Sequence, residues 1–267
     1  MTTPGRFDEI VDRLIRESPK LHFYSEDDVR REAKYAKKYG YALSAGPATL
    51  SVHPDVLRLF PKYAGSNSLT LETGCGYTTI ALAALSKHHV CISPDKVGRH
   101  LVEQYMDAIG LPRHKVTFIE QSSESALPTL SLDRQVDFAY VDGCHGYPFP
   151  ALDWHFIDKH LKVKGYIGFD NVEIPTVKLH CDFLEANRAY SLDNRIIFGG
   201  RGGYQVNIYQ KEKDEPREWV FQQFNERKLP SPVARVPGRI ERALTRVLPW
   251  RLVQVPLRKR FGWPKGD

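Results

Sequence analysis

Strand-like and helix-like segments alternate through the middle of the chain, and this order constrains the fold more than any other feature. The strand-like segments cover residues 68–74, 89–93, 115–121, 136–143 and 165–171. The helical patterns cover residues 78–88, 95–110 and 151–164. Because parallel strands need helical connections between them, this alternation predicts a parallel sheet with helices on both faces.

The pattern changes after residue 171. A helical segment at 177–187 precedes two strand-like runs, 194–200 and 203–211, and a glycine-rich turn joins these two runs. Runs joined in this way predict an antiparallel hairpin. We therefore expect an α/β fold with a Rossmann-like, seven-stranded, mostly parallel sheet, helices on both faces and a C-terminal antiparallel hairpin.

The segments on either side of this region differ from it. Apolar residues recur at helical spacing early in 7–40, and 25–40 has a leading serine, early acids, late lysines and a final glycine, all typical of a helix. A short helix is expected between Pro54 and Pro61. We predict three parts: a helical extension at 1–64, an α/β domain at 65–212 and a C-terminal extension at 213–267.

The length and composition are those of a folded protein with one catalytic-sized domain. The chain has 267 residues, of which 42% are hydrophobic and 26% are charged. No basic region followed by an apolar run opens the sequence, and no run of about eighteen apolar residues occurs. The four cysteines lack metal-type spacing, so we expect reduced thiols and a cytoplasmic protein.

The end of the chain is strongly basic. Residues 234–267 contain nine Lys and Arg against two acids, whereas the whole chain has a net charge of +6. The basic residues alternate with Leu, Val, Ile and Trp, a pattern that allows peripheral contact with the inner face of an anionic membrane. Packing on the domain, or on a partner in a homo-oligomer, is the alternative, because Pro249 and Pro256 interrupt a long surface helix.

The segment 69–83, LTLETGCGYTTIALA, joins an apolar strand to a helix through two glycines. Gly74 and Gly76 let the backbone turn sharply and approach a ligand without an intervening β-carbon. The helix that follows directs its free N–H groups toward that ligand. Glu72 can accept a hydrogen bond from a cationic amine, which favours the amino-acid end of S-adenosylmethionine over a pyrophosphate. A tight turn that binds nothing is the alternative.

The sequence ETGCGYTT at 72–79 resembles the first signature of class I S-adenosylmethionine-dependent methyltransferases, and 68–211 follows the order of elements in that family. Family members commonly carry an acid for the ribose after the second strand and an acid near the adenine after the third. Here serines and a later aspartate occupy these places. The resemblance implies that the cofactor contacts Glu72, Gly74, Gly76, Tyr77, Thr78, Ser93, Asp95, Ser122, Ser123 and Asp142.

Two further strands end in polar clusters, YVDGCHGY and GFDNVE. The carboxyl ends of parallel strands share one edge of a sheet, so we expect Asp142, Asp170 and Asn171 to lie together there. Two carboxylates and an amide oxygen form a hard donor set, which suits Mg²⁺ or Ca²⁺. Each cluster taken singly is also compatible with an ordinary turn or helix cap.

This arrangement is similar to the metal site of catechol-type O-methyltransferases, in which an Asp and an Asp-Asn pair hold a divalent ion. The pattern Asp-Gly-x-His-x-Tyr at 142–147 also resembles sugar and macrolide O-methyltransferases. That resemblance implies catalytic roles for Asp142 and for His145, with His145 taking the proton of the acceptor hydroxyl. His145 can instead orient Asp142 or bind substrate.

The acceptor class follows from the same cluster. The strand end lacks the Asn-Pro-Pro-Tyr and Pro-Cys motifs of base methylation, so nucleic acid is a disfavoured partner. We expect metal-assisted methylation of a hydroxyl on a small molecule, a sugar or a lipid-linked saccharide. The alternatives are a methyltransferase that needs no metal and a non-catalytic protein that binds S-adenosylmethionine as a scaffold.

Overall fold

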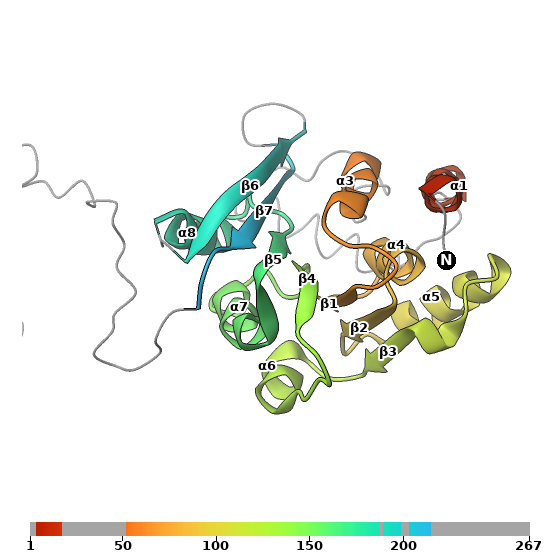
Figure 1. Ribbon diagram of the computed structural model, residues 1–267, viewed down its shortest axis with the longest axis horizontal. Coiled ribbons are helices and arrows are strands. Elements are labelled where there is room, and N and C mark those ends of the chain that lie inside the picture. The colour runs from red at the N-terminus through yellow and green to blue at the C-terminus, as the bar shows by residue number, and fades with distance from the viewer. Residues whose placement is uncertain (1–3, 18–51, 187–188, 199–202, 215–267) are drawn as a thin grey trace, which may run out of the picture. The chain divides into compact units, whose positions relative to one another are not determined.

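The computed structural model describes residues 4–17, 52–186, 189–198 and 203–214 (Figure 1). All of them belong to one compact unit, Met1–Phe224. The helix expected at 25–40 and the basic segment at 234–267 lie outside the described residues. The boundaries expected at 64/65 and 212/213 stay predictions.

A single seven-stranded sheet forms the centre of this unit, as the sequence predicts. Its strands, in chain order, are β1 (Leu69–Thr73), β2 (His88–Ile92), β3 (Val116–Ile119), β4 (Val136–Val141), β5 (Leu161–Phe169), β6 (Tyr190–Ile197) and β7 (Gln205–Lys211). Their order across the sheet is β3-β2-β1-β4-β5-β7-β6. β1 to β5 pair in parallel, and β7 pairs antiparallel to both β5 and β6. The closing hairpin is therefore confirmed.

Helices cover both faces of the sheet (Figure 1). One hydrophobic cluster joins α1 (Pro4–Glu17), α3 (Pro54–Leu59), α4 (Tyr77–Leu85) and α5 (Lys96–Ala108) to one face. A second cluster joins α6 (Ser123–Ala126), α7 (Phe149–His160) and α8 (Pro175–Ala186) to the other face. Short 3₁₀ turns at Phe60–Lys62, Arg113–Lys115 and Leu127–Thr129 complete the connections. None of the described helices is long and apolar enough to span a bilayer.

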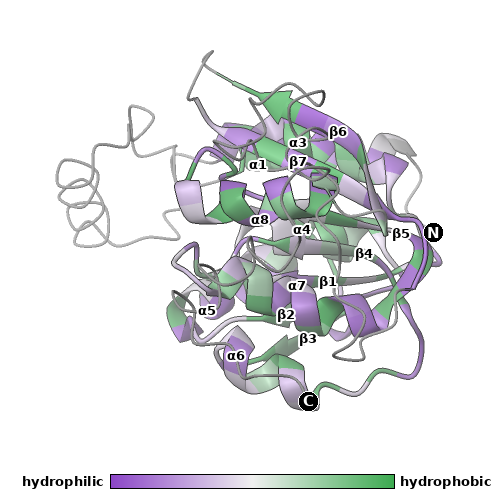
Figure 2. Ribbon diagram, turned by 90° about the vertical axis from the view of Figure 1, so that its left-hand side faces the viewer, coloured by the Kyte–Doolittle hydropathy of each residue, from purple (hydrophilic) through white to green (hydrophobic). Residues whose placement is uncertain are grey.

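Amphipathic sequence patterns explain which helix faces are buried. On α1, Phe7, Val11 and Leu14 recur at helical spacing and are almost fully buried, so the helix packs with this stripe against α4. Hydrophilic and hydrophobic residues likewise alternate along α7 (Figure 2). Trp154 and Ile157 are its buried apolar side chains.

The structure corrects several element boundaries: α4 ends at Leu85 rather than residue 88, and β6 begins at Tyr190 rather than residue 194. The helix expected to reach residue 164 ends at His160, and β5 already begins at Leu161. The Lys211 ammonium donates hydrogen bonds to the carbonyl oxygens of Asp158 (2.8 Å) and Leu161 (3.0 Å), which satisfies the end of α7 from a distant strand. Lys164 then adopts a φ of 66°, and the pairing of β5 with β4 shifts there.

Candidate cofactor and acceptor site

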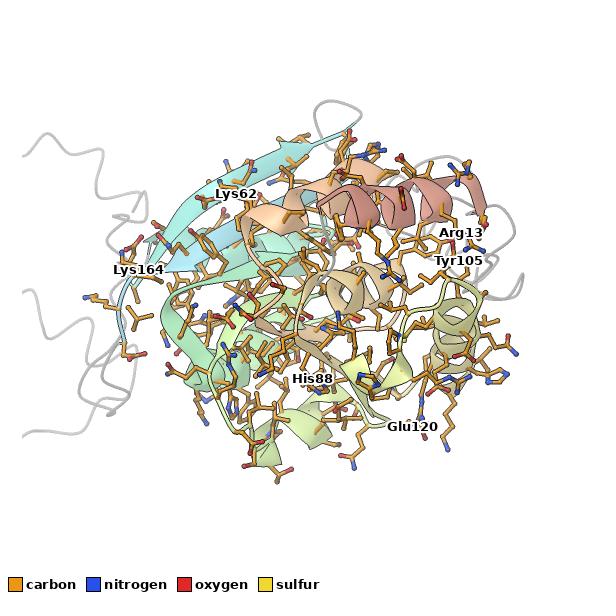
Figure 3. The ribbon with its side chains drawn as sticks, turned by 45° about the vertical axis from the view of Figure 1, so that its right-hand side comes forward. Arg13, Lys62, His88, Tyr105, Glu120 and Lys164 are labelled. Carbon is orange, nitrogen blue, oxygen red and sulfur yellow. The ribbon has the colours of Figure 1, made fainter. Side chains whose placement is uncertain are left out.

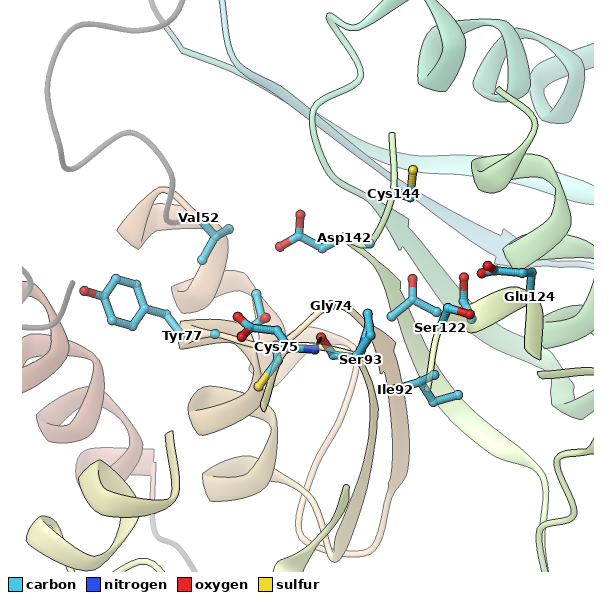
Figure 4. Close-up of a pocket in the computed structure, with 17 residues that line it drawn as sticks. Val52, Gly74, Cys75, Tyr77, Ile92, Ser93, Ser122, Glu124, Asp142 and Cys144 are labelled. Atoms are coloured by element: carbon cyan, nitrogen blue, oxygen red, sulfur yellow. Dashed lines mark hydrogen bonds between the residues drawn. The ribbon is translucent and has the colours of Figure 1, made fainter. Parts of the chain in front are cut away.

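A cavity of about 310 Å³ opens at the carboxyl ends of β1, β2 and β4 and beside the loop after β3 (Figure 4). Of the ten residues predicted to bind the cofactor, nine line this cavity: Gly74, Gly76, Tyr77, Thr78, Ser93, Asp95, Ser122, Ser123 and Asp142. Val52, Cys75, Glu124 and Cys144 are among the lining residues that the sequence did not suggest. The volume is within the range of small-molecule sites.

The two glycines of the loop serve different purposes. Gly74 has a φ of +104°, and a β-carbon there would lie 2.3 Å from the carbonyl oxygen of Asp142. Gly74 is therefore required because the backbones of two loops approach each other. Gly76 is the N-cap of α4 with extended backbone, and a β-carbon there would meet no atom within 4 Å. Gly76 instead leaves space in the cavity.

Glu72 lies beneath the loop rather than at the cavity wall. Its side chain is fully buried, and its Oε1 accepts a hydrogen bond from the Thr79 hydroxyl. His89 Nε2 lies 3.1 Å from the same oxygen. Thr79 and His89 did not emerge from the sequence, because their relation to Glu72 depends on the register of β1 with β2 and on the packing of α4.

The ribose-side candidates form a small hydrogen-bonded turn at the end of β2. Ser93 Oγ accepts a hydrogen bond from the Asp95 N–H (3.2 Å). Asp95 Oδ1 accepts from the N–H groups of Val97 (3.0 Å) and Gly98 (2.9 Å), so this carboxylate caps α5. Both side chains line the cavity, and the cap fixes the position of Asp95 there.

A buried carboxylate that the sequence did not reveal lies behind Ser123. Asp153 on α7 is fully buried, and burial raises its pKa. Neither carboxylate oxygen has a hydrogen-bond partner among the described residues, although the nearby Ser123 and Thr73 side chains partly oppose the rise in its pKa. Thr73 and Ser123 both line the cavity, so Asp153 connects two parts of its wall. The sequence around Asp153 is that of an ordinary amphipathic helix, so it does not indicate that this side chain lies behind the cavity wall.

Asp142 and Asp170 come together at the ends of β4 and β5, as predicted. Asp170 Oδ1 accepts hydrogen bonds from the hydroxyls of Tyr140 (2.7 Å) and Tyr204 (2.5 Å). Burial raises the pKa of Asp142 to about 7, and the nearby charge of Glu72 contributes to this rise. Burial and the charge of Asp142 likewise raise the pKa of Asp170 well above its usual range.

The other predicted site residues flank this pair. His145 Nε2 lies 3.6 Å from Asp142 Oδ1. The backbone carbonyl of His145 accepts a hydrogen bond from the Thr176 hydroxyl, which fixes the loop. Asn171 has a φ of 51°, and its amide nitrogen donates to Glu173 Oε1 (3.0 Å). The amide nitrogen of Asn171 is therefore occupied within the turn. The amide oxygen is the atom of this side chain that could coordinate a cation.

Three side chains with oxygen atoms, Asp142, Asp170 and Asn171, follow the ends of β4 and β5. Within the described ranges, no group of three or more His, Cys, Asp or Glu side chains is arranged to hold a metal ion. Two neighbouring carboxyl groups with raised pKa values nevertheless fit a hard cation, because a cation would offset the charge of Glu72 that raises the pKa of Asp142 and the charge of Asp142 that raises the pKa of Asp170. Asp170 Oδ1 already accepts two hydroxyl groups, so Oδ2 is its oxygen for such an ion.

Part of the chain matches a known family of protein domains. Residues 71–172, which contain the loop, both carboxylates and every residue that lines the cavity except Val52, match the model of a methyltransferase domain family. Over these residues the chain is similar to a methyltransferase domain. No curated protein sequence matches the chain.

Solved structures share the fold of this chain. The O-methyltransferase TomG of Streptomyces achromogenes, in complex with S-adenosylmethionine, is 17% identical with a TM-score of 0.52; the match covers 71% of this chain and 92% of TomG. The O-methyltransferase of Bacillus cereus is 18% identical with a TM-score of 0.50, covering 71% and 92%. Cofactor-bound Rv0187 from MTB is 13% identical with a TM-score of 0.54, covering 80% and 100%. At these identities the likeness concerns the fold.

Proposed function

We propose that the methyltransferase domain binds S-adenosylmethionine in the cavity beside Gly74–Thr78 and transfers its methyl group to a hydroxyl oxygen. The acceptor is a small molecule, a sugar or a lipid-linked saccharide. The observation that carries the proposal is the pair of His145 and Asp142, 3.6 Å apart, with Asp142 on the wall of the cavity. This pair places a proton acceptor beside the cofactor.

Cofactor binding is supported by the shape and chemistry of the cavity. A glycine-rich turn leads into α4, so the first turn of the helix directs its N–H groups toward the cavity. TomG and the Bacillus cereus enzyme, which share this fold, are O-methyltransferases solved with S-adenosylmethionine and its product S-adenosylhomocysteine.

In the proposed reaction, His145 removes the proton of the acceptor hydroxyl as its oxygen attacks the methyl carbon. The new bond joins oxygen to carbon, the sulfur–carbon bond breaks, and S-adenosylhomocysteine leaves with the bonding electron pair. Asp142 orients His145 and compensates the charge of the imidazolium. Asp170, held by Tyr140 and Tyr204, keeps Asp142 in place.

We also propose that a divalent cation, Mg²⁺ or Ca²⁺, assists the reaction. Asp142, Asp170 and the amide oxygen of Asn171 would hold it. When bound, the ion would lower the pKa of an acceptor hydroxyl. The competing proposal is a reaction without metal, which the two tyrosine hydroxyls favour because they already stabilise the Asp170 carboxylate.

Calorimetric titration tests the cofactor first. S-adenosylhomocysteine is titrated into chelator-treated protein, with and without Mg²⁺ or Ca²⁺, and we expect a Kd of about 1 μM. A separate heat of ion binding that Asp170→Asn abolishes would support the cation. Absence of that heat would leave the reaction without metal. Absence of nucleoside binding would refute the proposed function.

The catalytic pair is tested by methyl transfer from labelled S-adenosylmethionine to a panel of hydroxylated acceptors. We expect His145→Gln to lower turnover by about 100-fold or more, while the Kd of S-adenosylhomocysteine stays unchanged. His155→Gln is the matched control, because His155 lies on the exposed face of α7. Equal turnover in the two variants would exclude His145 as the base, and no transfer by the wild type to any acceptor would favour a binding scaffold.

Two partner assignments stay predictions, since the basic C-terminal segment lies outside the described residues. Peripheral membrane contact predicts that anionic liposomes sediment the full chain but not a chain that ends at Gly238. Equal sedimentation of both would exclude this contact. A homo-oligomer predicts a mass above 30.6 kDa in light scattering.

A further inference from the structure

A chain of buried polar side chains runs beneath the cofactor loop. In the parallel pairing of β1 with β2, Thr70 lies opposite His89 and Glu72 lies opposite Cys91. Thr70, Glu72 and His89 are all fully buried, as is Thr79 on α4. Polar groups of this kind are costly in a protein interior unless they satisfy one another, so their arrangement is informative.

The contacts connect His89 to the backbone of the loop. His89 Nδ1 lies 2.9 Å from the Thr70 hydroxyl, and His89 Nε2 lies 3.1 Å from Glu72 Oε1. The Thr79 hydroxyl donates to the same Glu72 oxygen and accepts a hydrogen bond from the Gly76 N–H (2.9 Å). A continuous path therefore leads from the imidazole, through Glu72 and Thr79, to the residue that begins α4.

Glu72 depends on this histidine. A buried carboxylate without polar neighbours carries a large desolvation cost. Among the described residues, His89 Nε2 lies within ion-pair distance of Glu72 Oε1 but makes no hydrogen bond, and Glu72 Oε2 has no hydrogen-bond partner. Loss of His89 would leave Glu72 with only the Thr79 hydroxyl, and the carboxylate would turn toward the water in the cavity.

We propose that His89 is a positioning residue for the cofactor. Through Glu72 and Thr79 it holds the loop Gly74–Thr78 in the conformation that receives the amino-acid end of S-adenosylmethionine. The inference rests on the proposed cofactor, and it adds a determinant of affinity that does not itself touch the ligand. The candidates for the adenosine end, Ser93, Asp95, Ser122 and Ser123, line the cavity after β2 and β3, and none of them is part of this path.

The neighbouring histidine provides a matched control. His88, labelled in Figure 3, precedes His89 on β2. It is only half-buried, and its Nε2 pairs with the Thr117 hydroxyl of β3 (2.9 Å). The two residues share side-chain type and strand and differ in which face of the sheet they reach. Replacement of each by Leu therefore separates the contact with Glu72 from a general effect on β2.

The experiment compares two nucleosides by calorimetry. S-adenosylhomocysteine carries the amino-acid end, and 5′-methylthioadenosine lacks it. We expect His89→Leu to weaken S-adenosylhomocysteine binding by about 10- to 100-fold while 5′-methylthioadenosine binds within about twofold of the wild type. His88→Leu should bind both nucleosides as the wild type does. His89→Gln should restore part of the lost affinity, because its amide N–H can reach Glu72.

A second variant covers the case in which His89→Leu does not fold. Thr79→Val keeps the side-chain shape but removes the hydroxyl between Glu72 and Gly76, so we expect the same selective loss. Equal weakening of both nucleosides would mean that His89 only stabilises the fold, and unchanged S-adenosylhomocysteine binding would exclude any role. Either result leaves the cofactor assignment intact, whereas a wild type that binds neither nucleoside would refute the assignment and this inference with it.

Discussion

Substitution of Gly74 by Ala is the sharpest test of the site geometry. The β-carbon would lie 2.3 Å from the Asp142 carbonyl oxygen and 2.9 Å from its carbonyl carbon, at a φ of +104°. Relief requires a movement of about 1 Å, since non-bonded atoms are attractive only near 3.5 Å. The strands resist this movement, because Gly74 donates its N–H to Ile92 (3.0 Å) and Asp142 donates to Thr73 (2.9 Å).

The expected loss of stability in Gly74→Ala is the sum of the cost of the unfavourable φ and the cost of overpacking. An unfavourable φ costs about 1–3 kcal/mol and overpacking costs about 1–3 kcal/mol, so we expect a loss of about 2–6 kcal/mol. For a domain of this size that loss lowers Tm by about 5–15 °C. Thermal unfolding measures the shift, and calorimetry with S-adenosylhomocysteine measures the accompanying loss of affinity.

Gly76→Ala is the informative comparison. Its backbone is extended and its β-carbon would meet no protein atom within 4 Å, so stability should change by less than about 0.5 kcal/mol. The new methyl group would occupy the cavity, and the Kd of S-adenosylhomocysteine should rise by about tenfold or more. Gly65→Ala, also without a neighbour within 4 Å, is the neutral control. A Gly74→Ala protein with the stability and affinity of the wild type would refute this reasoning.

Three further predictions concern buried polar groups. Burial lowers the pKa of His180 to about 3, so below about pH 6.5 the unfolded chain binds a proton that the folded chain does not. The free energy of unfolding, measured by urea titration, should therefore fall by about 2–3 kcal/mol between pH 7 and pH 4.5. His180→Phe should reduce this dependence of stability on pH. Lys211→Met leaves the end of α7 and the Asp158 carboxylate without their cation, and urea unfolding should show a loss of about 3 kcal/mol or an unstable chain. Tyr204→Phe removes one of the two hydroxyl groups that donate hydrogen bonds to Asp170. The rate of methyl transfer should fall by about tenfold, while the Kd of S-adenosylhomocysteine stays unchanged. An unchanged rate would show that Tyr140 alone positions Asp170.

The sequence predicts the sheet and the edge that carries the site, because both depend on local patterns. Apolar strands, helical periodicity and the glycines of the loop are properties of neighbouring residues. The rule that ligands bind at the carboxyl ends of parallel strands then places Asp142 and Asp170 together. The predicted end of α7, at residue 164, is wrong, because the observed end at His160 depends on Lys211, about fifty residues later in the chain.

The details of the site depend on contacts between distant segments. Glu72 was expected to face the ligand, but the structure places it against His89 and Thr79 and away from the cavity wall. Asp153 lies on a helix whose pattern is that of ordinary packing. No local pattern marks such residues, since a buried polar side chain is recognised only when its partners are known.

The strand order has a consequence for the synthesis of this protein. β7 is the last of the described strands to leave the ribosome, yet it lies between β5 and β6. Until residue 211 has emerged, the nascent sheet ends at an unpaired β5, and β6 has no neighbour in it. An open edge of this kind attracts other strands, so the nascent chain is exposed to aggregation during this interval and is a natural client for chaperones.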